Sequence, residues 1–303
     1  MTRVVSRTDL AANASVALAG VFWGLFWLPM RAFDQAGLAG GWASLWLYLF
    51  SAALLLPIAL VRRRRLGDAG VVLLVTGFFT GAGFTFYATS LLLTEVVRTL
   101  LLFYMTPVWS TLLGRLLLQE RITGGRGLAI ALGIAGLAVI LGVDSGLPLP
   151  RNLGDWLALL AGLAWAYGSV RIRREQDTEA FEQVFAFFIG GLVVSAAVVL
   201  LPAEQIGLSP SGNVLRSLAP WLLVLVAAFV VPSVFMVIWG ATLLSPGRVG
   251  ILLMGEVVVG IASAAVLTDE PFGAREAIGT ALIVSAGFIE VLTQPLRAGG
   301  RRT

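Results

Sequence analysis

Ten long apolar segments account for most of the chain, and short connections that carry most of the charged residues separate them. Each segment is about as long as the roughly 20 apolar residues that a helix needs to cross a bilayer. They cover residues 13–33, 41–61, 70–92, 95–118, 125–143, 153–173, 181–201, 218–241, 247–267 and 273–293. The pattern therefore predicts an all-α integral membrane protein with ten transmembrane helices and no separate soluble domain.

The composition supports a lipid environment and narrows the chemistry. Of the 303 residues, 58% are hydrophobic and 13% are charged, and the mean hydropathy is +0.92. A water-soluble protein of this length could not cover so much apolar side chain with so little polar surface. Cysteine and histidine are both absent from the sequence, which excludes disulfides, Cys/His metal sites and Ser–His catalysis. We therefore expect no metal and no cofactor.

Two further absences argue against an enzyme. All 21 basic residues are arginines, so a lysine Schiff base is excluded. The chain also lacks a glycine-rich phosphate-binding loop, so we expect that ATP is not used directly. Energy for any transport would come from an ion gradient or from the gradient of the substrate itself. We predict that the protein is not an enzyme.

The arginines predict the orientation in the membrane. An even number of spans puts both termini on one side, and the cytoplasmic side of a membrane protein is enriched in arginine. With both termini inside, the inner segments hold fifteen arginines and the outer segments hold five, with Arg115 left inside a span. The run "RRRR" at 62–65 independently favours a cytoplasmic second loop. The sequence pI is about 10.3. We attribute this high value to the arginines that set the orientation in the membrane, and we expect no nucleic-acid partner. The prediction is a multi-pass protein of the inner (plasma) membrane with both termini cytoplasmic.

The two halves of the chain resemble each other weakly. "RTLLLFYMTPVWSTLLGRLLLQE" (98–120) aligns without gaps with "RVGILLMGEVVVGIASAAVLTDE" (248–270) at an offset of 150, pairing Arg98 with Arg248 and Glu120 with Glu270. "FWGLFWLPMR" (22–31) aligns with "AWAYGSVRIR" (164–173) at an offset of 142, pairing Trp23 with Trp165.

Five spans separate the members of each pair, so equivalent spans cross the bilayer in opposite directions. This is an inverted-topology repeat, an arrangement common among secondary transporters, whose sites lie near the midplane between the repeats. The predicted repeats are residues 1–146, with five helices, and residues 147–303, with the other five.

Four stretches resemble a known family. They are "FWG" in the first span, "LLLQERITGGRGLAIALGIAG" at the junction of the fourth and fifth, "GDWLALLAGLAWA" at the start of the second half, and "MGEVVVGIASAAVLTDEPFG" in the ninth span. On these motifs the chain resembles the ten-helix drug/metabolite transporter superfamily of the EamA type. The resemblance implies a transporter of small metabolites with a central cavity lined by the first, fourth and sixth spans. Some members of this superfamily export amino acids, including aromatic ones.

Depth in the membrane sorts the aromatic residues. Those near span ends are typical of the interfacial belt, where an amphipathic ring meets the lipid headgroups. This group contains Trp42, Tyr87, Trp156, Trp221 and Trp239.

The deeper aromatic residues have polar N–H or O–H groups far from the headgroups, so we expect them to face protein or a cavity. For any single residue, simple packing is the more common explanation. With Thr106 and Glu256 added, the candidate substrate-binding residues are Trp23, Trp27, Tyr104, Thr106, Trp109, Trp165 and Glu256.

Glu256 is the one charged residue between Val249 and Leu267. A charge near the bilayer centre costs about 3 kcal/mol on insertion scales, and such residues are functional by default. Two roles remain open. Glu256 either makes hydrogen bonds to a neighbouring helix, or it faces the cavity and binds a substrate amine or a coupling proton. Its equivalent in the repeat is Thr106.

The leading functional hypothesis is a secondary transporter that moves small metabolites, with amino acids the first candidates, out of the cell by alternating access. The aromatic lining with few charges favours neutral, zwitterionic or moderately apolar solutes. The outward direction follows from the resemblance alone. Three alternatives stay open: an importer, a passive channel for small solutes, and a non-transporting membrane scaffold. The sequence does not indicate an oligomeric state.

Overall fold

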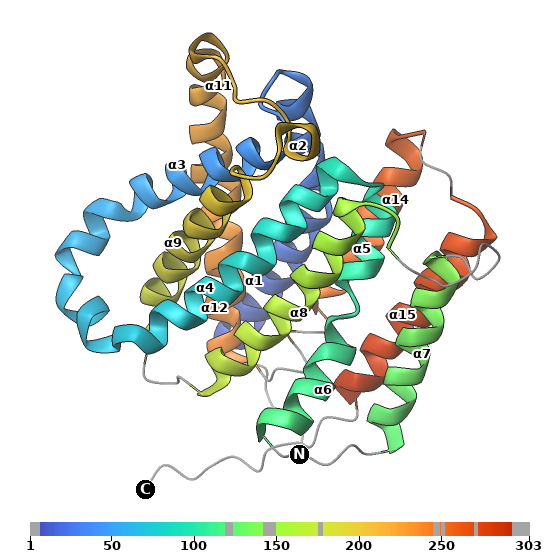
Figure 1. Cartoon of the computed structure of the whole chain (residues 1–303). Coiled ribbons are helices and arrows are strands. Elements are labelled where there is room, and N and C mark those ends of the chain that lie inside the picture. Colours follow the sequence, from blue (N-terminus) through green and yellow to red (C-terminus); the bar gives the residue numbers. More distant parts are fainter. Residues whose placement is uncertain are drawn as a thin grey trace, which may run out of the picture.

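The computed structural model describes residues 7–118, 124–141, 150–174, 178–244, 249, 252–269 and 272–292. All regular secondary structure in these ranges is helical, and the helices pack into one bundle (Figure 1). The elements are α1 (Arg7–Gly24), α2 (Trp27–Gln35), α3 (Gly40–Val61), α4 (Arg63–Leu93), α5 (Val96–Phe103), α6 (Thr106–Leu118), α7 (Gly124–Leu141), α8 (Leu153–Arg174), α9 (Ala180–Val198), α10 (Ala203–Ile206), α11 (Gly212–Leu225), the π-helical turn η2 (Val226–Val230), α12 (Val231–Leu243), α14 (Gly255–Leu267) and α15 (Ala274–Leu292).

The predicted all-α membrane fold is confirmed, because helix covers most of each of the ten predicted segments. Among the described residues, six helical stretches are long and apolar enough to cross a bilayer. They are Leu10–Gln35, Gly40–Val61, Arg63–Leu93, Leu153–Ile172, Ala180–Val198 and Gly212–Gly240. Two shorter apolar helices, Gly127–Gly136 and Gly255–Leu267, belong to the fifth and ninth predicted spans.

Breaks in the helices explain why the fourth and ninth segments are not single long helices. The helix of the fourth segment stops at Phe103 and restarts at Thr106, after a turn at Tyr104. In the ninth segment, a turn at Met254 separates the helical residues 252–253 from α14. Tyr104 and Met254 are equivalent at the repeat offset of 150, so both halves break at the same place.

Proline accompanies three of the interruptions. Pro29, Pro107 and Pro232 lie in the first turns of α2, α6 and α12, each just after a break or a π-helical turn. Proline is tolerated at this position because its missing N–H would have no partner inside the helix. The carbonyl groups that such breaks release at membrane depth need partners from neighbouring protein.

Helix packing follows the predicted repeat. In that repeat α1 and α2 are equivalent to α8, α3 to α9, α4 to α11 and α12, α5 and α6 to α14, and α7 to α15. Helix α4 packs on α8, and its equivalent α12 packs on α1; α5 and α6 pack on α8, and their equivalent α14 packs on α1. The pairs α3–α9, α5–α14 and α7–α15 each join equivalent helices, and α7 and α15 lie side by side at one edge of the bundle (Figure 1).

This exchange of packed pairs supports the inverted repeat. The boundary between residues 146 and 147 lies outside the described residues and stays a prediction. Glu120, Arg248 and Glu270, which take part in the sequence match between the halves, also lie outside them.

An ion-pair cluster joins the α3–α4 corner to the start of α9. The Arg62 guanidinium donates to Glu182 Oε1 at 2.7 Å and also pairs with Glu179, which Arg65 contacts as well. The Arg62 hydrogen bond holds the pKa of Glu179 below its ordinary value, and the Glu179 carboxylate raises the pKa of Arg62. Glu182 is 2% exposed whereas the Glu179 side chain is 58% exposed, so the buried member fixes the position of Arg62.

A second buried pair lies at the opposite end of the bundle. Asp155, in the first turn of α8, is fully buried and accepts hydrogen bonds from Arg98 Nε at 3.2 Å and from Thr94 Oγ1 at 3.0 Å. The backbone N–H of Arg151 donates to the same carboxylate at 2.9 Å. A buried charge is tolerated when it is paired and its remaining lone pairs are used in this way.

Candidate functional site

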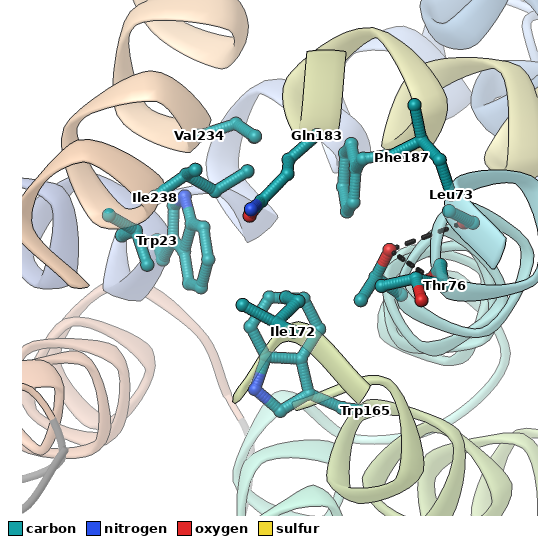
Figure 2. A pocket seen from close by; sticks show the side chains of 12 residues that line it. Trp23, Leu73, Thr76, Trp165, Ile172, Gln183, Phe187, Val234 and Ile238 are labelled. Atoms are coloured by element: carbon teal, nitrogen blue, oxygen red, sulfur yellow. Dashed lines mark hydrogen bonds between the residues drawn. The ribbon is translucent and has the colours of Figure 1, made fainter. Parts of the chain in front are cut away.

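A small cavity lies between helices from both halves of the chain. Its volume is about 20 Å³, room for about one water molecule. Figure 2 shows aromatic and aliphatic side chains closing around it. The lining residues are Trp23, Leu73, Thr76, Gly77, Thr80, Trp165, Ile172, Gln183, Phe187, Val234, Val237 and Ile238, from α1, α4, α8, α9 and α12. None of them is charged.

Trp23 and Trp165 are the two predicted site residues that line this cavity. Their rings meet edge to face with centroids 5.9 Å apart, and Trp23 also packs on Phe84 at 5.8 Å. Trp23 is 5% exposed, and its indole N–H donates to Ser233 Oγ on α12 at 3.0 Å. These contacts place the equivalent tryptophans of the two predicted repeats against each other at the cavity.

Glu256 lies at the contact between the two broken segments. Its carboxyl group is 1% exposed, in the first turn of α14, where the helix dipole favours an acidic side chain. The Tyr104 hydroxyl lies 2.9 Å from Glu256 Oε2 and 2.9 Å from the carbonyl oxygen of Leu253, just before the Met254 break. Tyr104 thus serves both the carboxyl group and a carbonyl near the break.

Thr106 supports the break in its own span. Its hydroxyl donates to the Phe103 carbonyl at 2.6 Å. A Cβ on Gly162 of α8 would lie 2.6 Å from that same oxygen, so glycine allows α8 to approach the break. The repeat has a counterpart: a Cβ on Gly20, the equivalent of Gly162, would lie 3.1 Å from the Leu252 carbonyl oxygen. Thr106 is not among the residues that line the cavity.

Trp27 and Trp109 also lie outside the cavity lining. The Trp27 N–H donates to Ser263 Oγ on α14 at 3.0 Å, and the Arg31 guanidinium lies over the Trp27 ring at 5.5 Å from its centroid. Trp109 is half-buried on α6, and its N–H has no hydrogen-bond partner among the described residues. Trp27 therefore joins α2 to α14 in this conformation.

Tyr87 departs from the sequence-based prediction. We expected it in the interfacial belt, but it is 2% exposed and its phenol interacts with Glu256. Counting residues along the span placed Tyr87 near its end, but it did not show which face of α4 the residue occupies. Its ring packs on Phe84 at 6.0 Å and on Phe103 at 4.9 Å, which connects the cavity aromatics to the Glu256 region.

Gln183, Thr76 and Thr80 also line the cavity and were not predicted from the sequence. Gln183 is a neutral polar residue near the start of an apolar segment, and that position could have identified it as a candidate cavity residue. The threonines gave no such signal, because threonine is common in membrane helices and bonds its own backbone.

A polar depression of about 530 Å³ lies toward the other ends of α4 and α8. It is lined by Arg31, Leu92, Leu93, Thr94, Glu95, Arg98, Arg151 and Asn152. The cavity lining uses residues between 73 and 80 in the middle of α4 and the second half of α8, whereas the depression lies at the last turn of α4 and the residues before α8. The two recesses therefore lie along different parts of α4 and α8.

These features define a multi-pass helical membrane protein with a small internal cavity between its halves. Residues 10–142 match the model of the EamA-like transporter family, so the predicted resemblance to that family is confirmed.

A curated relative from Escherichia coli (strain K12), described as a "Probable amino-acid metabolite efflux pump", is 29% identical over 192 residues. The match covers 60% of this chain and 63% of the relative, so the chain spans less than two thirds of the relative that it matches. A chain in a solved crystal structure is 19% identical, with a TM-score of 0.55 over 92% of this chain and 97% of its own length. This second likeness shows a shared fold.

Proposed function

We propose that the protein is a secondary transporter that moves small metabolites, amino acids first among them, out of the cell by alternating access. The observation that carries this proposal is the small uncharged cavity closed between helices of both halves, with Trp23 and Trp165 at their contact. A typical ligand site encloses about 300–1,000 Å³. A cavity of about 20 Å³ therefore belongs to a conformation in which the binding space is shut.

The hydrogen bonds suggest which parts of the bundle move together. Trp23 and Trp27 each donate to a serine, on α12 and α14, so α1, α2, α12 and α14 form one connected group. Helices α4, α5, α6 and α8 pack as a second group, with Asp155 binding Arg98. The Tyr104 contacts to Leu253 and Glu256 cross from the second group to the first. We propose that alternating access separates these groups at one end and closes them at the other.

The side chains that line the cavity indicate which class of solute it would bind. Aromatic rings and short aliphatic chains supply most of its surface, and no lining side chain carries a fixed charge. An anion would lose its hydration there without a counter-charge. The lining therefore favours neutral, zwitterionic or moderately apolar solutes, which is consistent with the description of the E. coli relative as an amino-acid metabolite efflux pump.

We further propose that the protein acts in the inner membrane with both termini cytoplasmic, as the arginine distribution predicts. In that orientation the cavity lies on the cytoplasmic half and the polar depression on the outer half. Glu256, buried in the first turn of α14, is the candidate for binding a coupling proton.

Transport is tested with the purified full-length chain in liposomes and a panel of labelled amino acids and neutral metabolites. A carrier gives saturable uptake that increases when the vesicles are preloaded with unlabelled substrate. Flux that neither saturates nor responds to preloading would instead indicate a passive channel. No flux above protein-free vesicles for any member of the panel would contradict transport and favour a non-transporting role.

A further inference from the structure

The cavity contains a side-chain acceptor, the Gln183 oxygen, that has no donor in the described part of the chain. The side-chain oxygen of Gln183, on the first turn of α9, is buried and accepts no hydrogen bond from the described residues. Gln183 lines the cavity, and Figure 2 shows its side chain extending into the space between Trp23 and Phe187. A buried carbonyl without a donor is unfavourable, so such a group calls for an explanation.

The orientation of the Gln183 amide follows from its other contact. Its Nε2 lies 3.2 Å from the backbone carbonyl oxygen of Thr178, which can only accept a hydrogen bond. Reversing the amide would put two oxygens against each other. The nitrogen therefore belongs at Thr178, and the oxygen is the atom left without a donor.

The polar groups of Thr76, Thr80 and Trp23, which also line the cavity, are already engaged. The Thr80 hydroxyl donates to the Thr76 carbonyl at 2.9 Å. The Thr76 hydroxyl donates to the Val72 carbonyl at 3.1 Å and accepts from Arg171 Nε at 3.0 Å. The Trp23 N–H is bound to Ser233. Among these groups, only the Gln183 oxygen lacks a partner in the described part of the chain.

We propose that Gln183 is a substrate-binding residue that accepts a hydrogen bond from an ammonium or amide N–H of the solute. The proposal deepens the transport function and rests on it. Gln183 and the rings of Trp23 and Trp165 line the same cavity, and aromatic faces attract cations. A carbonyl acceptor beside aromatic faces favours a solute with an N–H donor attached to an apolar body. It disfavours a solute whose only polar group is a carboxylate.

Three probes that share a phenyl ring separate the contribution of the ammonium group to binding from that of the carboxylate group. L-Phenylalanine carries an ammonium and a carboxylate, phenethylamine keeps only the ammonium, and 3-phenylpropionate keeps only the carboxylate. Equilibrium dialysis of each probe against the purified full-length chain measures its affinity. The variants are Gln183→Leu and the nearly isosteric Gln183→Glu, with Gln35→Leu as a control because Gln35 is exposed at the end of α2.

Gln183→Leu should weaken binding of L-phenylalanine and phenethylamine about tenfold, as expected for one hydrogen bond, and leave 3-phenylpropionate unchanged. Gln183→Glu should strengthen phenethylamine and weaken 3-phenylpropionate, and Gln35→Leu should change nothing. If Gln183→Leu does not yield monodisperse protein, the opposite shifts in Gln183→Glu decide.

Two results would overturn the proposal. Unchanged preference among the three probes in the Gln183 variants, with the wild-type chain binding L-phenylalanine, would remove the role of Gln183 but leave transport standing. No binding of L-phenylalanine or phenethylamine to the wild-type chain would overturn the proposal. The proposed amino-acid substrates would lose support as well, whereas saturable flux of another metabolite would still preserve a transporter.

Discussion

At the scale of single residues, the role of the cavity can be tested by comparing two tryptophans, one that lines the cavity and one that is exposed on the surface of the bundle. Trp165 is half-buried and lines the cavity, whereas Trp221 is 66% exposed on α11. Trp165→Ala removes the ring that packs on Trp23, so we expect transport to fall about tenfold, the size of one aromatic contact. Trp221→Ala at equal expression is the control and should transport normally. Equal losses in initial flux would show that the cavity position has no special role.

Glu256 offers a test of proton coupling. Glu256→Gln keeps an oxygen that can accept from the Tyr104 hydroxyl but removes the ionisable group. We expect a folded variant whose transport no longer responds to pH, because a neutral amide cannot exchange the proton. Initial flux into liposomes across a pH series measures this.

Tyr104→Phe is the companion variant, because it removes the hydrogen bond and leaves the carboxyl group in place. It should retain the pH response. Normal flux with an unchanged pH response in Glu256→Gln would assign Glu256 a structural hydrogen-bonding role.

At the scale of the helices, the close contact between α1 and α14 can be tested by substituting a glycine. A Cβ on Gly24, the last residue of α1, would lie 2.7 Å from the Glu256 carbonyl oxygen and 3.0 Å from the Gly260 nitrogen. These are backbone atoms, so α1 and α14 would have to separate. Overpacking of this kind costs about 1–3 kcal/mol. We expect Gly24→Ala to lower the free energy of unfolding by that amount in mixed micelles.

Gly255 is the matched control for this change. A Cβ there meets no atom within 4 Å, and alanine is the better helix former. Gly255→Ala should therefore be neutral or slightly stabilising. Equal destabilisation by the two substitutions would mean that backbone flexibility, and not the α1–α14 contact, is what glycine supplies.

The ion pairs at the start of α9 provide a second test on this scale. Glu182 is buried and its Oε2 has no partner in the described residues, whereas Glu179 is exposed. Glu182→Gln should therefore lower the thermal unfolding midpoint by several degrees, and Glu179→Gln by much less.

The pH dependence of the Glu179 contribution has a definite sign. Its pKa is lowered in the folded protein by the Arg62 hydrogen bond, so its stabilisation is present above its ordinary pKa. That stabilisation is lost as the pH falls through the lowered value. A midpoint for Glu179→Gln that falls with acid as steeply as in the wild type would contradict this assignment.

Sequence periodicity predicted the elements well but their faces poorly. All ten apolar segments contain helix, because apolar length alone decides whether a segment can cross a bilayer. Pro29, Pro107 and Pro232 each lie just after an interruption of a helix, whereas the break at Met254 has no proline beside it. Tyr87 was misplaced and Gln183 was missed because which face of a helix meets the cavity depends on tertiary packing. Trp23 and Trp165 were found because their depth in the predicted spans made them candidates, and the repeat alignment paired them.

Symmetry on the scale of the whole molecule accounts for several local features at once. The breaks at Tyr104 and Met254 are equivalent, and so are Gly162 and Gly20, each of which lies against a carbonyl beside the opposing break. Glu256 and Thr106 are equivalent positions with different chemistry. The two halves therefore share the position of the break and the glycine that lies against it, and they differ in the side chain at the Thr106 and Glu256 positions.

The predicted orientation of the whole chain in the membrane can be measured directly by labelling single cysteines. Asp68 follows the "RRRR" run near the start of α4, and Ser211 immediately precedes α11; both are exposed. Because the sequence has no cysteine, Asp68→Cys and Ser211→Cys each carry a single thiol. Arginine-rich segments stay cytoplasmic, so an impermeant maleimide added to intact cells should label Ser211→Cys alone. Asp68→Cys should react only after permeabilisation. Labelling of Asp68→Cys and not Ser211→Cys in intact cells would reverse the orientation and with it the proposed cytoplasmic side of the cavity.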